Sequence, residues 1–199
     1  MGRVLLTGAS GFIAAHVLDA FLKNGHFVRF TVRTQEKADQ ILQANMKYKD
    51  QLESVIVPAE GAYDVALQDN SLDGVIHTAS PFHMNFSDPH ELLKPAIQGT
   101  RGILEAIVRL APNVKRLVIT SSFAAMIHAD EGRWPGHDYS EKDWNPVTME
   151  QALTGEKITT YRASKTFAER AAWEFVSSSS PKPNFDLVTL CPPMVYGPI

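Results

Sequence analysis

The regular alternation of strand-like and helix-like segments is the feature that most restricts the fold of this chain of 199 residues. Short apolar runs rich in branched and aromatic side chains are typical of strands, and apolar residues that recur with the helical period are typical of helices. The strand-like runs cover residues 4–6, 26–32, 55–57, 73–78, 114–120 and 185–190. The helix-like patterns cover residues 11–24, 36–46, 89–110 and 160–177, and a loop-rich segment covers residues 128–158.

Strands that alternate with helices predict a parallel sheet with helices on both of its faces. The strand-like runs show no alternation of apolar and polar residues, as expected when both faces of the sheet are covered. The sequence therefore predicts a doubly wound α/β domain. At 199 residues, the chain is most simply one domain, residues 1–199.

The first strand-like run leads into a loop that contains two glycines, Gly8 and Gly11. Gly8 permits a tight turn, and Gly11 lets backbone N–H groups approach a diphosphate. The helix that begins near Gly11 directs the positive end of its dipole at that charge, and Ala14 allows close packing on the strand. Because such loops are common between strands and helices, this one alone is weak support for a dinucleotide site.

Composition argues against several classes of protein. The net charge of −3 and the dispersed basic residues give no reason to expect nucleic acid or a membrane surface as a partner. No apolar stretch approaches the roughly 20 residues of a membrane span, and no targeting segment precedes the first strand. Cys191 is the only cysteine, and the histidines lack metal-ligand spacing, so we expect no metal site. We expect a cytoplasmic protein.

Tyr161 and Lys165 lie four residues apart in a predicted helix and so share one face of it. A nearby ammonium favours the phenolate form of a tyrosine, which can then exchange a proton with a carbonyl or alcohol oxygen. The alternative for an isolated pair of this kind is an exposed helix face without a catalytic role.

Two hydroxyls, those of Ser121 and Ser122, follow the fifth predicted strand. Open α/β sheets bind their ligands at the carboxyl ends of the strands, so a serine here could hold a substrate oxygen. The alternative is a strand-end turn in which the hydroxyls cap the backbone.

Taken together, these segments resemble the extended short-chain dehydrogenases/reductases, which form the NAD-dependent epimerase/dehydratase superfamily. The likeness is greatest to the group of dihydroflavonol reductases, cinnamoyl-CoA reductases and fungal ketoreductases of the methylglyoxal-reductase type. It covers essentially the whole chain and rests on five ordered motifs: Thr7-Gly8-Ala9-Ser10-Gly11-Phe12-Ile13-Ala14, His77-Thr78-Ala79-Ser80-Pro81-Phe82, Thr120-Ser121-Ser122, Tyr161-Arg162-Ala163-Ser164-Lys165 and Pro192-Pro193-Met194-Val195-Tyr196-Gly197-Pro198. The resemblance implies a Rossmann fold with strand order 3-2-1-4-5-6.

The resemblance also implies roles for individual residues. It makes Ser122 the residue that holds the substrate oxygen, Tyr161 the general acid, and Lys165 the residue that binds the nicotinamide ribose. Phe82 and Phe123 are implied at the border of the substrate pocket. The residues implied at the cofactor are Gly8, Ser10, Gly11, Phe12, Ile13, Arg33, Lys37, Thr78, Ala79, Ser80, Tyr161, Lys165, Pro192 and Val195.

The residues after the second predicted strand indicate NADP rather than NAD. Sites that prefer NAD place a carboxylate at the end of this strand, where it bonds the ribose 2′-hydroxyl and would repel a 2′-phosphate. Here the strand ends at Arg33, and Lys37 follows four residues later. Both cations suit a phosphate, which arginine can bind with two hydrogen bonds. Alternatively, both are solvated charges at the start of a helix.

Three positions depart from the family pattern. The segment around Glu60 looks shortened where relatives place an aspartate near the adenine, and Glu60 is no clear replacement. Cys191 stands where relatives usually carry asparagine or arginine, and we interpret it as a small strand-end residue, not a nucleophile. Relatives continue well beyond the position of Ile199, so we expect most of the C-terminal substrate lobe to be absent from this sequence.

The leading hypothesis is a reductase that uses NADP(H) to convert a small aldehyde or ketone to its alcohol, as a monomer or homodimer. One alternative is a nucleotide-sugar epimerase or dehydratase, or a 3β-hydroxysteroid dehydrogenase, of the same superfamily. Another is a dinucleotide-binding or sensor module without catalysis, although such homologues typically lose the tyrosine or the lysine that this chain retains. The natural substrate is left open.

Overall fold

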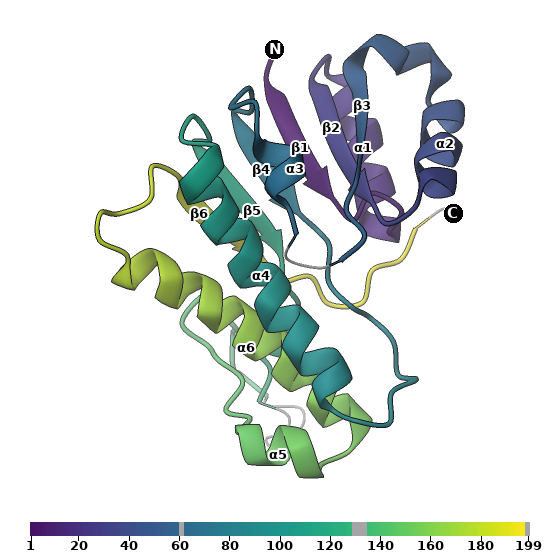
Figure 1. The fold of residues 1–199 in the computed structure, drawn as a ribbon. Coiled ribbons are helices and arrows are strands. Elements are labelled where there is room, and N and C mark those ends of the chain that lie inside the picture. The colour runs from purple at the N-terminus through teal and green to yellow at the C-terminus, as the bar shows by residue number, and fades with distance from the viewer. Residues whose placement is uncertain (60–61, 129–134, 198–199) are drawn as a thin grey trace.

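A computed structural model describes residues 1–59, 62–128 and 135–197 of the chain (Figure 1). The strands are β1 (Arg3–Thr7), β2 (Phe27–Val32), β3 (Leu52–Ile56), β4 (Gly74–His77), β5 (Arg116–Thr120) and β6 (Asp186–Leu190). The α-helices are α1 (Phe12–Lys23), α2 (Gln35–Ala44), α3 (Asp64–Leu67), α4 (His90–Leu110), α5 (Met149–Thr154) and α6 (Lys157–Ser178). Two short 3-10 helices, η1 (Met46–Gln51) and η2 (Phe123–Ala125), complete the described elements.

The six strands form one sheet in the order β3-β2-β1-β4-β5-β6, and every neighbouring pair is parallel. The predicted doubly wound α/β fold and its strand order are therefore confirmed. The order reverses between β1, which pairs with β2, and β4, which pairs with β1 on its other edge. In open sheets of this type, such a reversal opens a crevice at the carboxyl ends of the strands, where ligands bind.

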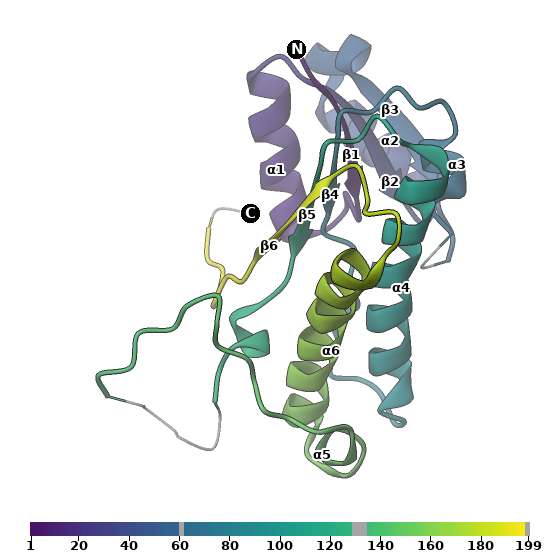
Figure 2. The same cartoon turned by 90° about the vertical axis from the view of Figure 1, so that its left-hand side faces the viewer.

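The two faces of the sheet carry separate layers of helices (Figures 1 and 2). Leu6 and Phe30 pack with Leu18 of α1 on one face, which α1 and α2 cover. Leu5 packs with Ile103 of α4 on the other face, which α4 and α6 cover. Consecutive side chains of a strand point to opposite faces of the sheet, so Leu5 and Leu6 pack in different hydrophobic cores. This explains why the strands are apolar without alternation.

Helices α4 and α6 run side by side on their face of the sheet (Figure 2). Small residues are buried in both: Gly99 and Thr100 in α4, and Ala168 and Ala172 in α6. Small side chains let two helix backbones lie close together. This close packing places the first half of α6, which contains Tyr161 and Lys165, next to the strand ends of the sheet.

Three parts of the secondary structure differ from the prediction. The predicted loop 128–158 contains α5 and the start of α6, Lys157 and Ile158. The signal for α5 is a capping box in which Thr148 and Gln151 bond each other's backbone, but the helix has only six residues, too few for an apolar period. Strand β3 begins at Leu52, before the predicted residue 55, because parallel pairing with β2 extends it. Helix α3 was not predicted.

None of the helices in residues 1–59, 62–128 and 135–197 combines the length and the apolar character that crossing a membrane requires.

Candidate active site

A cleft of about 850 Å³ lies at the carboxyl ends of β1, β2 and β4, where the strand order reverses. It brings together nine residues that the sequence analysis assigned to the cofactor or the substrate pocket. These are Gly8, Ser10, Gly11, Arg33, Lys37, Thr78, Ala79, Ser80 and Phe82. The segments that contribute them are far apart in the chain and meet only because β1 lies between β2 and β4.

The turn after β1 is held tightly against the turn after β4. Gly8 has a φ of +68°, and a Cβ built on it would lie only 2.8 Å from the Cα of Ala79. The Thr7 hydroxyl accepts a hydrogen bond from the Ala79 N–H at 3.2 Å, and the Thr78 hydroxyl donates to the Thr7 carbonyl at 2.6 Å. No side chain can occupy the space at Gly8, which explains the glycine at this position in terms of both conformation and contact.

Arg33 and Lys37 bring positive charge to the cleft. Arg33 follows β2 and is exposed, whereas Lys37 is half-buried in the first turn of α2. Within the described part of the chain, neither side chain forms an ion pair, so no carboxylate among the described residues neutralises them. Two unneutralised cations on a glycine-turn cleft fit a phosphorylated dinucleotide such as NADP.

Neither Tyr161 nor Lys165 of α6 lines the cleft itself, but each contacts a residue that does. Lys165 is only 9% exposed, and its Nζ donates a hydrogen bond to the Oγ of Ser80 at 2.8 Å. The same Nζ lies 5.9 Å from the centre of the Tyr161 ring. On the other side, the Tyr161 ring meets the Phe82 ring edge to face, with 5.3 Å between the ring centres. The tyrosine and lysine therefore share a helix face, as predicted, and that face is turned toward the turn after β4.

His77, the last residue of β4, lies beneath the site. Its Nδ1 is 2.9 Å from the Thr7 hydroxyl, while its Nε2 is buried with no hydrogen-bond partner among the described residues. Burial first, and then the charge of Lys165, lower the pKa of His77 to about 3. His77 is therefore a neutral imidazole at ordinary pH, and the sequence analysis assigned it no role.

Ser122 and Phe123 lie at the end of β5, outside the lining of the cleft. The Ser122 hydroxyl accepts from the Ala124 N–H at 3.1 Å and so caps η2, which packs against α6. This bond is the capping role that the sequence analysis kept as an alternative, although the hydroxyl can still donate to another group. The Phe123 ring contacts the Tyr139 ring edge to face at 4.9 Å.

The C-terminal segment follows β6 in the chain. In space it passes from the loop after β5 to the start of α1. The Phe123 N–H donates to the Pro192 carbonyl at 3.0 Å, and a Cβ built on Gly197 would lie 3.6 Å from the Phe12 ring. Val195 and Phe12 are exposed, and neither they nor Ile13 and Pro192 line the cleft. Glu60, Ile199 and the final motif residue Pro198 lie outside the described residues.

Several residues that line the cleft were missed by the sequence analysis. Glu91, Pro95 and Gln98 come from one face of α4, as their spacing of four and three residues indicates. Val57 and Ala59 follow β3 and line the cleft where the expected adenine aspartate is missing. The helical spacing was visible in the sequence, but it could not show which face of α4 meets the cleft.

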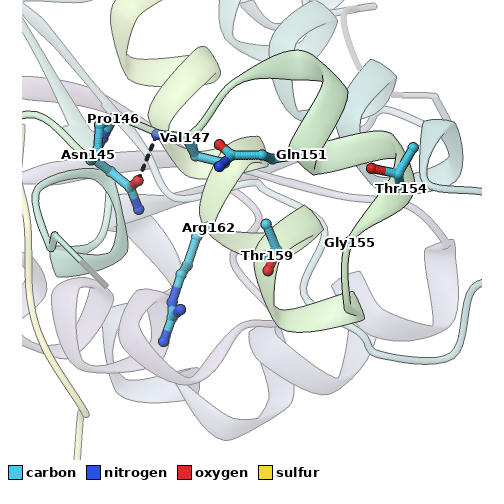
Figure 3. A pocket seen from close by; sticks show the side chains of 8 residues that line it. All are labelled: Asn145, Pro146, Val147, Gln151, Thr154, Gly155, Thr159 and Arg162. Carbon is cyan, nitrogen blue, oxygen red and sulfur yellow. Dashed lines mark hydrogen bonds between the residues drawn. The ribbon is translucent and has the colours of Figure 1, made fainter. Parts of the chain in front are cut away.

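A second, smaller hollow of about 240 Å³ lies beside the start of α6 (Figure 3). Segment 145–147, α5 and α6 surround it, and Arg162, the residue after Tyr161, contributes to its wall. The Asn145 side-chain oxygen accepts from the Val147 N–H at 2.9 Å and shapes the loop on one side. Sequence analysis predicted a loop for all of these residues except Arg162 and Thr159 and did not predict the hollow.

Comparison with known proteins gives the family. The chain matches the NAD dependent epimerase/dehydratase family over residues 4–199. The chain belongs to this family. The structure of yeast methylglyoxal/isovaleraldehyde reductase Gre2 in complex with NADPH is 35% identical and superposes with a TM-score of 0.93, covering 98% of this chain and 59% of that one. The resemblance to extended short-chain dehydrogenases/reductases is therefore confirmed.

Curated relatives in this family include fungal and plant reductases. The ketoreductase azaE of Aspergillus niger is 47% identical over 204 residues, which cover 98% of this chain and 58% of the relative. The cinnamoyl-CoA reductase CAD2 of Medicago truncatula is 36% identical over 201 residues, with the same coverage of both chains. The chain thus spans a little under three fifths of the length of these family members.

Proposed function

We propose that the chain carries the cofactor site and the proton-transfer residues of an NADPH-dependent carbonyl reductase that acts on small aldehydes or ketones. The observation that carries this proposal is the position of Lys165. Its ammonium bonds Ser80 at the cleft edge at 2.8 Å and lies 5.9 Å from the ring centre of Tyr161. One cation thereby connects the cleft, which suits a dinucleotide, to the phenol that would exchange a proton with substrate.

The cleft supports NADP(H) as the cofactor. The Gly8 turn and the first turn of α1 offer backbone N–H groups to a diphosphate, and Arg33 and Lys37 offer charge to a 2′-phosphate. NADPH, when bound, supplies the hydride for carbonyl reduction. The related yeast reductase Gre2 was solved with NADPH, which agrees with this choice.

The protein's own groups would handle the proton. Tyr161 would donate its phenolic proton to the carbonyl oxygen as that oxygen gains negative charge. Lys165, which is held by Ser80, would place its positive charge near the phenolate left behind. Ser122 would donate its hydroxyl hydrogen to the same oxygen and orient it, since its bond to Ala124 uses only an acceptor position. Phe82, packed on the Tyr161 ring, would border the substrate.

The test is turnover by the purified chain with NADPH and either methylglyoxal or isovaleraldehyde, the aldehydes named for Gre2. We expect NADPH consumption that Tyr161→Phe reduces by at least about 10³-fold, while NADPH affinity changes less than about threefold. Tyr48→Phe, a tyrosine in η1, is the matched control and should leave turnover unchanged.

Three outcomes would reject the proposal. Turnover that survives in Tyr161→Phe would remove the phenol from the mechanism. Tight NADPH binding without reduction of any carbonyl by the wild-type chain would favour the dinucleotide-binding module instead. Turnover of UDP-hexoses in place of simple carbonyls would favour the epimerase alternative.

A further inference from the structure

Helix α6 presents a third polar residue below Tyr161 and Lys165. Glu169 follows Lys165 by four residues, so the three side chains lie in succession along one helix face. Glu169 is only 7% exposed. Burying a carboxylate costs several kcal/mol unless hydrogen bonds replace its water. A carboxylate at this depth therefore needs specific donors around it.

Four neutral donors converge on Glu169. The Thr189 hydroxyl donates to Oε1 at 2.8 Å, and the Trp173 indole N–H donates to the same oxygen at 3.4 Å. The Ser121 hydroxyl donates to Oε2, and the Cys191 thiol donates to that oxygen at 3.4 Å. These donors come from the end of β5, from β6 with the residue that follows it, and from α6 itself. One carboxylate thus joins three elements.

Each element that Glu169 joins carries a residue of the proposed site directly beside the bond. Ser121 precedes Ser122, Cys191 precedes Pro192, and Glu169 lies one helical turn from Lys165. The backbone adds a parallel connection, because the Ser121 N–H donates to the Leu190 carbonyl at 2.8 Å. The bonds from Ser121, Thr189 and Cys191 form only when the two strand ends are docked on α6.

We infer that Glu169 is a positioning residue for the proposed reductase, an inference that rests on the function proposed above. Its carboxylate holds the ends of β5 and β6 against α6 and thereby sets Ser122 relative to Tyr161 and Lys165. It touches neither the cleft nor the reacting groups. Displacements of about 1 Å at reacting groups cost large factors in rate, so a bond of this kind acts on turnover more than on cofactor binding.

Two substitutions separate positioning from stability. Glu169→Gln keeps the shape and one acceptor oxygen, and the Ser121 and Thr189 hydroxyls can rotate to accept from its amide. Glu169→Leu removes every acceptor and deprives the buried Ser121 hydroxyl and the half-buried Thr189 hydroxyl of this partner. We expect kcat to fall about tenfold in the glutamine variant and about 100-fold in the leucine variant, with the Kd for NADPH changed less than about threefold in the glutamine variant. Glu174→Gln, exposed on the same helix, is the control and should match the wild type.

Turnover must be expressed per NADPH-binding site, so that loss of folded protein does not count as loss of rate. A residue that only stabilised the fold would lower the concentration of binding sites and leave kcat per site unchanged. An unchanged kcat per site in both Glu169 variants would overturn the inference.

Cys191 provides a readout that needs no catalysis. It is the only cysteine of the chain, and burial first, then the Glu169 carboxylate, raise the pKa of its thiol to about 11. Removing the carboxylate charge in Glu169→Gln lowers that pKa, so iodoacetamide at mildly alkaline pH should alkylate Cys191 about three to ten times faster. Glu174→Gln should react at the wild-type rate.

The turnover assay and the alkylation assay together separate failure of the proposed function from failure of the inference about Glu169. If the wild-type chain reduces no carbonyl, the proposed function fails, and the positioning role fails with it even where the alkylation rates confirm the contact of Glu169 with the strand end. If turnover is present but Glu169→Gln leaves the alkylation rate of Cys191 unchanged, the carboxylate does not sit at the strand end. That result overturns the inference and leaves the proposed function intact.

Discussion

The Nζ atom of Lys165 donates a hydrogen bond to the Oγ atom of Ser80 across 2.8 Å, although the two residues are 85 positions apart in the chain. This bond joins α6 to the turn after β4 and holds the ammonium of the buried Lys165 beside Ser80, which lines the cleft. The serine supplies one hydrogen-bond acceptor to an ammonium that the fold removes from water. The proposed function depends on this relationship.

Lys165→Met should lower both NADPH affinity and turnover, because it removes the charge that faces the cleft and Tyr161. We expect kcat/KM to fall by at least about 10³-fold, and by about tenfold in Ser80→Ala, which keeps the ammonium and removes one of its hydrogen-bond partners. Steady-state kinetics and NADPH titration measure both effects. Lys142→Met, an exposed lysine in the loop before α5, is the control, and equal losses in Lys142→Met would contradict the prediction.

Gly8→Ala should damage the cofactor cleft through a backbone collision. Its Cβ would lie 2.8 Å from the Ala79 Cα, in addition to the strain of a positive φ. Gly25→Ala shares that strain, with a φ of +75°, but meets no atom within 4 Å. Thermal unfolding should therefore show a loss of about 1 kcal/mol for Gly25→Ala and about 3 kcal/mol for Gly8→Ala. NADPH affinity should fall only in the Gly8 variant; equal losses of stability would mean that the collision is relieved.

Arg33 and Lys37 should determine the preference for NADPH over NADH. The double variant Arg33→Ser with Lys37→Ala should weaken NADPH binding by about 100-fold, because two charge-assisted contacts to the 2′-phosphate are lost. Binding of NADH, which lacks that phosphate, should change little. Fluorescence titration with both cofactors measures the ratio. Lys49→Ala in η1 provides a control for general loss of positive charge, and a parallel loss of NADH affinity would argue against the assignment.

His77 should make the fold sensitive to mild acid. The pKa of His77 is about 3 in the folded protein and near its ordinary value of 6.5 when unfolded. Between these values the unfolded chain binds the additional proton, so stability rises with pH across this window and is lost as pH falls. This group alone should cost about 2 kcal/mol between about pH 6.5 and about pH 5.

The His77 contribution is measured as a slope, which separates it from any packing defect in a variant. Urea unfolding of the wild type and of His77→Asn at several pH values gives the free energy of unfolding as a function of pH. The asparagine variant keeps a polar partner for Thr7 but does not titrate. Its slope should be smaller in the acid range, and equal slopes would assign the acid sensitivity to other groups.

Much of the fold could be predicted from local sequence. The alternating runs predicted six parallel strands, and the Gly8 and Gly11 loop predicted the turn between β1 and α1. Two short helices were not predicted, because they contain too few residues to show the helical period of apolar side chains: α5 has six residues and α3 has four. The early start of β3 at Leu52 also escaped, since pairing with β2 decides it.

The candidate site also has a part that local sequence predicts and a part that it does not. The shared face of Tyr161 and Lys165 follows from the geometry of one helix, and the candidate phosphate contacts Arg33 and Lys37 follow from their place after one strand. The roles of these residues remain predictions until the variants are measured. The lining contributed by Glu91 and Gln98 was not predictable, because helix α4 shows its period but not its orientation.

The amino-acid sequence by itself determined the order of strands and helices, the glycine turn and the helix face that carries the tyrosine and the lysine. These features depend on residues a few positions apart, where chain geometry leaves few choices. Only the tertiary structure decided that Ser80 accepts a hydrogen bond from the Lys165 ammonium. The same holds for the hydrogen bonds that Glu169 accepts from Ser121, Thr189 and Cys191. Residues tens of positions apart come into contact only once the strands have paired in this order and α6 has packed on the sheet. A local sequence pattern therefore cannot predict these contacts.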